Sequence, residues 1–162
     1  MFSRRKKTLA AEGAKAPGFR LTSLDGPTQS LDDILERGPV LLAFFKISCP
    51  VCQLTAPYLQ RLSLNNTLQV IGISQDDAGA TRGFAERLGV TFPTLLDLSS
   101  EDYPASNAYG ISSVPSMFLL ERDGTITRAF PGFSKRDFEE IGARVGVLPF
   151  APGDQVPEWK AG

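Results

Sequence analysis

This chain of 162 residues contains two cysteines, both within the tetrapeptide Cys49-Pro50-Val51-Cys52. At the start of a helix, two thiols with this spacing can face each other, because the second lies about one turn after the first. A thiolate in such a pair attacks a disulfide to give a mixed disulfide, and the second thiol then releases the product. The pair predicts thiol–disulfide exchange carried by the protein's own sulfur atoms, with no bound cofactor.

The thiol of Cys49 is expected to be the acidic member of the pair. Free backbone N–H groups of the first helical turn can donate to its sulfur, and the helix dipole favours negative charge there. Thiols with this spacing titrate at roughly 3.5–7.5, against about 8.5 for a free cysteine. Pro50 suits the first helical position and stiffens the turn, while Val51 adds an apolar wall, so both are expected to tune the site.

The composition removes several other kinds of chemistry. The chain has no histidine, which excludes Ser-His and Cys-His catalysis. Two cysteines alone cannot complete a zinc site, so we expect no bound metal. One alternative stays open, in which both cysteines are buried structural thiols. A strand followed by this motif and then a helix favours redox chemistry instead.

The elements that must position the pair lie on both sides of it. Residues 40–45 form an unbroken apolar run, which predicts a strand buried on both faces of a parallel or mixed sheet. Residues 50–64 place Leu54, Tyr58 and Leu62 on one helical face, and Pro57 inside this helix should kink it. The strand therefore leads directly into a helix that begins at the cysteines.

The rest of the chain alternates between strand and helix patterns. We predict strands at 19–24, 68–73, 90–96, 117–120 and 125–130, and helices at 31–37, 78–88 and from Ser134 to about 145. Pro93 indicates an edge or irregular position for the strand at 90–96. Asp123-Gly124 predicts a hairpin turn. This order predicts an α/β sandwich with a central mixed β-sheet flanked by helices.

We divide the chain into a disordered basic tail at 1–15, one domain at 16–147, and an extended proline-containing tail at 148–162. Contact with acidic lipid or nucleic acid is the alternative to a free basic tail. A formal net charge of −1 creates no general attraction for nucleic acid. We therefore expect neither nucleic acid nor a membrane as a partner, and a monomer or weak dimer.

The location of the protein is predicted from the same N-terminal region. Glu12, Gly13 and Lys15 interrupt any apolar stretch after the basic residues, so no secretory signal is predicted. The chain also lacks a run of apolar residues long enough to span a bilayer. Together these features predict a cytoplasmic protein.

A resemblance to a known family rests on several short stretches. The stretch Phe44-Phe45-Lys46-Ile47-Ser48-Cys49-Pro50-Val51-Cys52, with Pro57 further on, resembles the active-site segment of the thioredoxin superfamily. Other matching stretches are Ala16-Pro17-Gly18-Phe19, Val70-Ile71-Gly72-Ile73-Ser74, Phe92-Pro93, and Tyr109-Gly110-Ile111 to Val114-Pro115. Over residues 16–146 the chain is similar to the branch of TlpA-like and ResA-like thiol–disulfide proteins and the AhpC/TSA (redoxin, antioxidant) group. The resemblance implies a thioredoxin-like fold with an N-terminal β extension and an extra helix and strand between residues 75 and 97.

The resemblance also implies roles for individual residues. Cys49 would be the nucleophile and Cys52 the resolving thiol. Pro115 matches the cis-proline of the family, and the backbone of Val114 would pair with an extended substrate segment. The implied partners are protein disulfides or dithiols, together with an upstream thiol reductase or other electron donor.

The sequence departs from the family pattern at the positions of a buried acid. Ala43 and Thr55 occupy positions where thioredoxins and ResA-like proteins, respectively, carry that acid. Lys46 is a substitute candidate, since a cation near Cys49 would favour the thiolate, although a solvated lysine at a strand end is the preferred interpretation. For the neighbouring acids Asp76 and Asp77, loop and helix capping is preferred over a role in the site.

Three functions remain in competition. Disulfide exchange with protein substrates leads, and in a reducing compartment its direction is reduction. A peroxiredoxin-like thiol peroxidase is the second, but such enzymes carry threonine or serine three residues before the reactive cysteine, where this chain has Lys46. A redox-inactive thioredoxin-like binding module is the third, and the intact cysteine pair argues against it.

Overall fold

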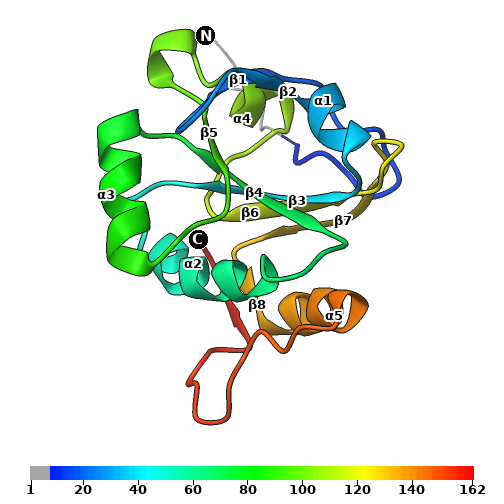
Figure 1. Cartoon of the computed structure of the whole chain (residues 1–162), viewed down its shortest axis with the longest axis vertical. Helices are drawn as coiled ribbons and strands as arrows, with labels where there is room; N and C mark the ends of the chain where they lie inside the picture. The colour runs from blue at the N-terminus through cyan, green and yellow to red at the C-terminus, as the bar shows by residue number, and fades with distance from the viewer. Residues whose placement is uncertain (1–7) are drawn as a thin grey trace, which may run out of the picture.

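The computed structural model describes residues 8–162, and Figure 1 shows a central sheet with helices on both faces. The main sheet has seven strands in the order β2-β1-β5-β4-β3-β6-β7, and a separate pairing joins β8 to β9. The strands are β1 (Arg20–Ser23), β2 (Gln29–Ser30), β3 (Val40–Phe45), β4 (Gln69–Ser74), β5 (Thr94–Leu96), β6 (Ser116–Leu120), β7 (Ile126–Pro131), β8 (Phe133–Ser134) and β9 (Trp159–Lys160). The helices are α1 (Leu31–Glu36), α2 (Pro50–Leu62), α3 (Ala78–Leu88), α4 (Pro104–Ala108) and α5 (Lys135–Val145), with a 3-10 turn η1 (Ser99–Glu101).

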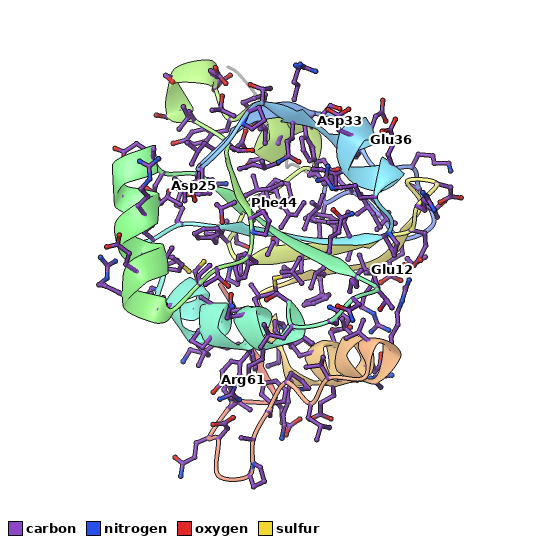
Figure 2. All side chains as sticks on the ribbon, viewed as in Figure 1. Glu12, Asp25, Asp33, Glu36, Phe44 and Arg61 are labelled. Carbon is purple, nitrogen blue, oxygen red and sulfur yellow. The ribbon has the colours of Figure 1, made fainter. Side chains whose placement is uncertain are left out.

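Strand β3 lies at the centre of the core. It pairs in parallel with β4 and antiparallel with β6, so the sheet is mixed, as predicted. All of β3 is buried because helices cover both faces: Leu41 and Ala43 pack with residues of α2 and α5, whereas Leu42 and Phe44 pack with residues of α1 and α4. Figure 2 shows the Phe44 side chain inside the molecule, with Asp33 at its rim. The apolar run that precedes the cysteines is therefore the most enclosed strand of the fold.

Helix α3 belongs to the inserted helix and strand, and it closes the side of the sheet nearest the motif. Its residue Phe84 stacks on Phe45 with ring centroids 5.1 Å apart, and both belong to one buried cluster with Cys52. The helix begins as predicted, because Asp77 accepts a hydrogen bond from the Ala80 N–H at 2.8 Å. The insertion therefore adds part of the apolar wall behind the second cysteine.

The position of β5 corrects one prediction. Pro93 suggested an edge or irregular strand, but β5 lies inside the sheet, between β1 and β4. The strand begins at Thr94, so the residue without an N–H precedes the ladder, and its carbonyl still accepts a hydrogen bond from the Gly72 N–H at 2.9 Å. A proline placed just before a short strand does not exclude a central position.

Residues 8–15 are not the free tail expected from the sequence. The N–H of Ala10 donates to the Tyr109 carbonyl at 2.9 Å, and the N–H of Gly13 donates to the Ile126 carbonyl at 2.8 Å. Leu9 and Ala10 also pack against the cluster on the α1 and α4 face. The boundary at residue 15 was placed too late because these small and apolar residues find partners far along the chain. The basic residues 4–7 lie outside the described residues.

Residues 148–162, predicted to be an extended tail, contain no helix and pack against the domain. Phe150 contacts the Tyr58 ring with centroids 5.0 Å apart, and Arg61 of α2 forms an ion pair with Asp154 (Arg61 is labelled in Figure 2). Strand β9 then pairs antiparallel with β8. The segment therefore runs along α2 and returns toward the cysteine motif, as Figure 1 shows in red.

Candidate active site

Cys49 lies between the end of β3 and the start of α2, at the N-cap of the helix. Its backbone is extended (φ −82°, ψ 116°), and its Sγ accepts a hydrogen bond from the Cys52 N–H at 3.3 Å. Pro50 occupies the first turn, where its missing N–H costs no hydrogen bond. The helix begins at the motif because a sulfur atom caps one of its free N–H groups.

The two cysteines are free thiols in very different surroundings. Cys49 is half-buried, whereas only 2% of the Cys52 surface is exposed. Burial raises the pKa of Cys52 well above its usual range, and the Cys49 thiol and the Asp76 carboxylate raise it further, against a backbone hydrogen bond with Lys46 that lowers it. Cys52 therefore stays a neutral thiol near neutral pH, which leaves the more exposed sulfur to act as the nucleophile.

The loop before β6 faces Cys49. Its Val114–Pro115 peptide bond is cis, as the family resemblance implied. The Val114 carbonyl accepts a hydrogen bond from the Cys49 thiol at 3.3 Å. The loop lies there because β6 runs antiparallel to β3, with Ser116 opposite Phe44, so that the start of β6 meets the end of β3.

The other side of the motif is apolar. Pro50, Val51 and Leu54 line a shallow surface together with Pro157 and Lys160 of the C-terminal segment. Val51 is buried, and its predicted effect on the site stays a prediction.

The C-terminal segment also reaches the Val114 carbonyl. Beyond β9, Gly162 lies so close that a Cβ on it would overlap that oxygen. Part of the loop backbone implied for substrate pairing is therefore in contact with the chain's own C-terminal segment.

Lys46 points away from the apolar side. Its side chain is half-buried, and its ammonium lies 6.0 Å from the centre of the Tyr103 ring. Its carbonyl accepts a hydrogen bond from the Cys49 N–H at 3.3 Å. That the Lys46 charge favours the Cys49 thiolate stays a prediction. The Lys46 side chain lines a polar pocket beside the motif.

The two acids after β4 have different roles. Asp77 caps α3, as predicted, but Asp76 accepts a hydrogen bond from the Ile47 N–H at 2.8 Å and thereby fixes the loop before Cys49. At the positions of the missing family acid, Ala43 is buried and the buried Thr55 hydroxyl donates to the Val51 carbonyl at 2.6 Å. Of these residues, only Asp76 brings a carboxylate close to the sulfur pair.

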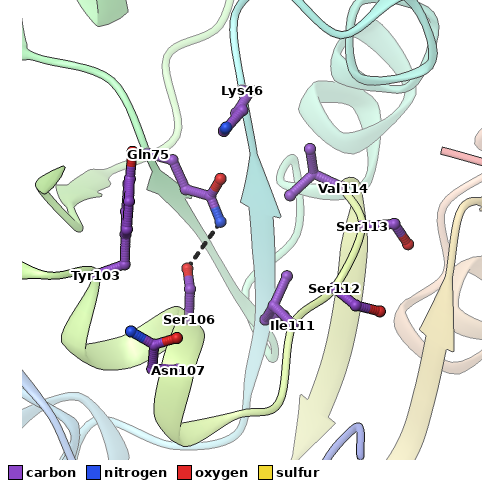
Figure 3. A pocket seen from close by; sticks show the side chains of 9 residues that line it. All are labelled: Lys46, Gln75, Tyr103, Ser106, Asn107, Ile111, Ser112, Ser113 and Val114. Carbon is purple, nitrogen blue, oxygen red and sulfur yellow. Dashed lines mark hydrogen bonds between the residues drawn. The ribbon is translucent and has the colours of Figure 1, made fainter. Parts of the chain in front are cut away.

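Sequence reasoning missed a group of polar residues beside the motif. Gln75, Tyr103 and Ser106 line a pocket with Lys46 and Val114, and Figure 3 shows them around a common space. A signal was present in the sequence: Lys46, Gln75 and Asp97 each directly follow one of the strands β3, β4 and β5. These strands are parallel, so their carboxyl ends meet at one edge of the sheet, where α/β proteins bind ligands.

Within residues 8–162, no group of three or more Cys, Asp or Glu side chains is arranged to hold a metal ion. In the same part of the chain, no helix is both long enough and apolar enough to cross a membrane.

The chain is similar in sequence to bacterial thiol–disulfide oxidoreductases. ResA, the thiol–disulfide oxidoreductase of Geobacillus kaustophilus, is 32% identical over 139 residues, which cover 83% of this chain and 78% of that protein. ResA of Geobacillus thermodenitrificans is 31% identical over 140 residues, with the same coverage.

Solved structures support the fold. The thioredoxin domain of a Bacteroides vulgatus thiol–disulfide oxidoreductase matches with a TM-score of 0.73 at 21% identity, over 83% of this chain and 98% of that domain. A thiol:disulfide interchange protein from a Bacteroides species matches with a TM-score of 0.73 at 20% identity, over 85% of this chain and 91% of that one. At these identities the likeness establishes the thioredoxin-like fold, which was predicted. The AhpC/TSA family model matches residues 13–129, and the chain therefore belongs to the AhpC/TSA family.

Proposed function

We propose that this protein is a thiol–disulfide oxidoreductase that uses Cys49 and Cys52 to exchange electrons with protein disulfides. The observation that carries the proposal is the asymmetry of the pair: Cys49 is accessible at a helix start, and Cys52 is buried one turn later. The names of the ResA relatives support the same activity.

The geometry supports a two-step reaction. In the first step, the Cys49 thiolate attacks one sulfur of a substrate disulfide; the substrate S–S bond breaks, a mixed disulfide forms, and the departing thiolate takes up a proton. In the second step, Cys52 gives up its proton and attacks the Cys49 sulfur, and the second substrate sulfur leaves as a thiol. The substrate gains two electrons and two protons, and the protein is left with a Cys49–Cys52 disulfide.

Burial of Cys52 separates these two steps. Because its pKa is raised, Cys52 is a poor competitor for the first attack. In the second step, the Cys52 proton passes to the second substrate sulfur as that sulfur leaves, so that no permanent base is required. An upstream thiol reductase or another electron donor then restores the dithiol, and reduction of substrate is the proposed direction.

The substrate is proposed to be an extended polypeptide. The Val114 carbonyl contacts the Cys49 thiol, and an extended chain that pairs with the Val114 backbone would present its disulfide to the sulfur. Membership of the AhpC/TSA family keeps a thiol peroxidase as the second candidate.

Cysteine variants test both candidates. Wild type, Cys49→Ser and Cys52→Ser are compared for reduction of insulin disulfides and for consumption of hydrogen peroxide, with Ser48→Ala as a neighbouring control. Exchange predicts that Cys49→Ser is inactive and that Cys52→Ser accumulates mixed disulfides. Peroxide consumption with a sulfenic acid at one cysteine would instead establish a peroxidase, and inactivity in both assays would leave a binding module.

A further inference from the structure

A polar pocket of about 220 Å³ opens beside the cysteine motif, and the two steps of disulfide exchange do not require it. Its walls come from the ends of β3 and β4, from α4 and the residue before it, and from the loop before Pro115 (Figure 3). It lies outside the carboxyl ends of parallel strands, which is where open α/β sheets bind their ligands. The position makes it a candidate for binding the substrate.

The pocket is directly connected to the reacting sulfur. Val114 forms one wall, and its carbonyl accepts the hydrogen bond from the Cys49 thiol. Lys46 forms another wall, and its carbonyl accepts the hydrogen bond from the Cys49 N–H. A residue next to the reacting cysteine of a substrate would therefore reach this pocket.

A buried carboxylate holds the floor of the pocket in place. Asp97 is fully buried and accepts hydrogen bonds from the Ala105 N–H at 3.0 Å, the Ser106 N–H at 2.8 Å and the Ser106 hydroxyl at 2.6 Å. The Ser106 oxygen in turn accepts a hydrogen bond from the Gln75 amide at 2.9 Å. This series of hydrogen bonds fixes the Gln75 side chain, whose oxygen points toward the Lys46 ammonium in Figure 3.

The opposite wall is held by an unusual backbone conformation. Asp102 and Tyr103 both have positive φ, at 60° and 46°, a region that is costly for residues with a Cβ. Pro104 follows and begins α4, and the conformation places the Tyr103 ring beside Lys46. Backbone strain of this kind persists where the surrounding structure holds the residue in place. Here the residue is Tyr103, whose side chain lines the pocket.

Lys46 supplies the charge that selects a ligand. Among the described residues it forms no ion pair, although its side chain is half-buried. The two acids that follow β4 and β5 at this edge of the sheet have other partners, Asp76 the Ile47 N–H and Asp97 the first turn of α4. An ammonium without a counter-ion in a polar cavity favours an anionic ligand.

We propose that the pocket binds a carboxylate that the substrate carries next to its reacting disulfide, and that Lys46 is the specificity-determining residue. The inference rests on the proposed function and narrows its substrates to disulfides with an adjacent acidic group. Two sources share this chemistry: an acidic residue beside a protein cysteine, and glutathione, whose carboxylates lie near its sulfur.

The test uses short peptides that differ only beside one cysteine. The peptides carry Glu, Gln or Lys on both sides of the cysteine, which is activated as a mixed disulfide with thionitrobenzoate, and glutathione activated in the same way is the second source. Release of the coloured thiolate by the reduced 162-residue protein, followed in a single turnover, gives a second-order rate constant for each. The variants are Lys46→Met and, as a matched loss of charge far from the site, Lys15→Met.

Wild type is expected to prefer the Glu peptide over the Gln peptide by about fivefold, the size of one partly exposed ion pair. Lys46→Met is expected to remove the preference and Lys15→Met to keep it. Equal rates for all peptides in wild type, or a preference that survives in Lys46→Met, would overturn the inference. If Lys46 only tuned Cys49, the variant would change all rates by one factor and leave their ratio unchanged, which would also overturn it.

The glutathione arm identifies the source of the carboxylate. A rate that depends on Lys46 as the Glu peptide does would include glutathione among the ligands, and independence from Lys46 would leave acidic protein residues. Equal release rates for all peptides would contradict carboxylate binding in the pocket and leave disulfide exchange intact. No release from any peptide would contradict the proposed function as well.

Discussion

The two flanks of the Val114–Pro115 loop differ in what covers them. One flank is apolar, formed by the first turn of α2, and the C-terminal segment lies on it with Gly162 against the Val114 carbonyl. The other flank is polar, with Lys46 and Tyr103 facing a cavity that residues 8–162 leave open. Both flanks border the same thiol, yet within this described part of the chain the C-terminal segment covers one flank and not the other.

The difference separates reactivity from recognition. Helix capping at Cys49, burial of Cys52 and contact with the Val114–Pro115 loop all act on the sulfur pair itself, and they would act on any disulfide that reaches Cys49. Selection among disulfides needs groups outside the motif. In this molecule the polar flank provides them, while the apolar flank is held by β9 and the residues that follow it.

The largest effect is expected from the floor of the polar flank. Asp97→Ala removes a buried acceptor of three hydrogen bonds and leaves two N–H groups of α4 without a partner. The free energy of unfolding should fall by about 3–5 kcal/mol, measured by urea denaturation. Asp97→Asn, which keeps one acceptor, should lose less. A loss below about 1 kcal/mol for Asp97→Ala would show that α4 is held by other contacts.

Burial of Cys52 predicts the next largest effect, on alkaline stability. Because the folded state holds the Cys52 proton to a higher pH than the unfolded chain does, stability should fall as pH rises above about 9. The expected slope is about 1.4 kcal/mol per pH unit for this group. The measurement compares unfolding of reduced wild type and Cys52→Ala between neutral and alkaline pH. Parallel curves for the two proteins would contradict burial of the thiol.

Removal of the C-terminal segment tests the apolar flank. A chain that ends at Val156 loses β9 and the contact of Gly162 with the Val114 carbonyl. The rate of reduction of a protein disulfide should rise by about fivefold, as expected when an occupant that covers a site for most of the time is removed. A small aromatic disulfide should react at an unchanged rate. Trp159→Ala, which alters an exposed side chain and keeps the backbone pairing, is the control. If truncation changed the rates of both substrates by the same factor, or changed neither, the prediction would be wrong.

The smallest effect is expected from one hydroxyl on the polar flank. Tyr103→Phe keeps the ring beside Lys46 and removes a hydrogen-bond donor from the pocket. The preference for the Glu peptide over the Gln peptide should fall by about twofold, the lower range for a single exposed hydrogen bond. An unchanged ratio in the same kinetic assay would restrict recognition to the lysine.

The local parts of the site were predictable because they depend on neighbours in the chain. The apolar run of β3, the cap at Cys49 and the helix start at Ser134 follow from periodicity and capping chemistry within a few residues. The central place of β5 was not predictable in this way, because it depends on pairing with β1 and β4, which come from distant parts of the sequence.

The same reason explains the residues that were missed. The sequence pattern led to no prediction for Gln75 or Asp97, and for Asp76 it predicted loop capping. Their importance appears only when three parallel strands bring their ends together beside α4. The packed positions of residues 8–15 and 148–162 likewise depend on partners about a hundred residues away for the first segment and on α2 for the second.

By itself, the sequence determined which atoms carry the chemistry, since its two thiols lie one helical turn apart after a buried strand. The tertiary structure decided which thiol is exposed, which flank is covered and which charge faces the open pocket. The physical reason is that reactivity is set by bonded neighbours and the first turn of a helix, whereas burial and recognition depend on surfaces that strand order alone brings together.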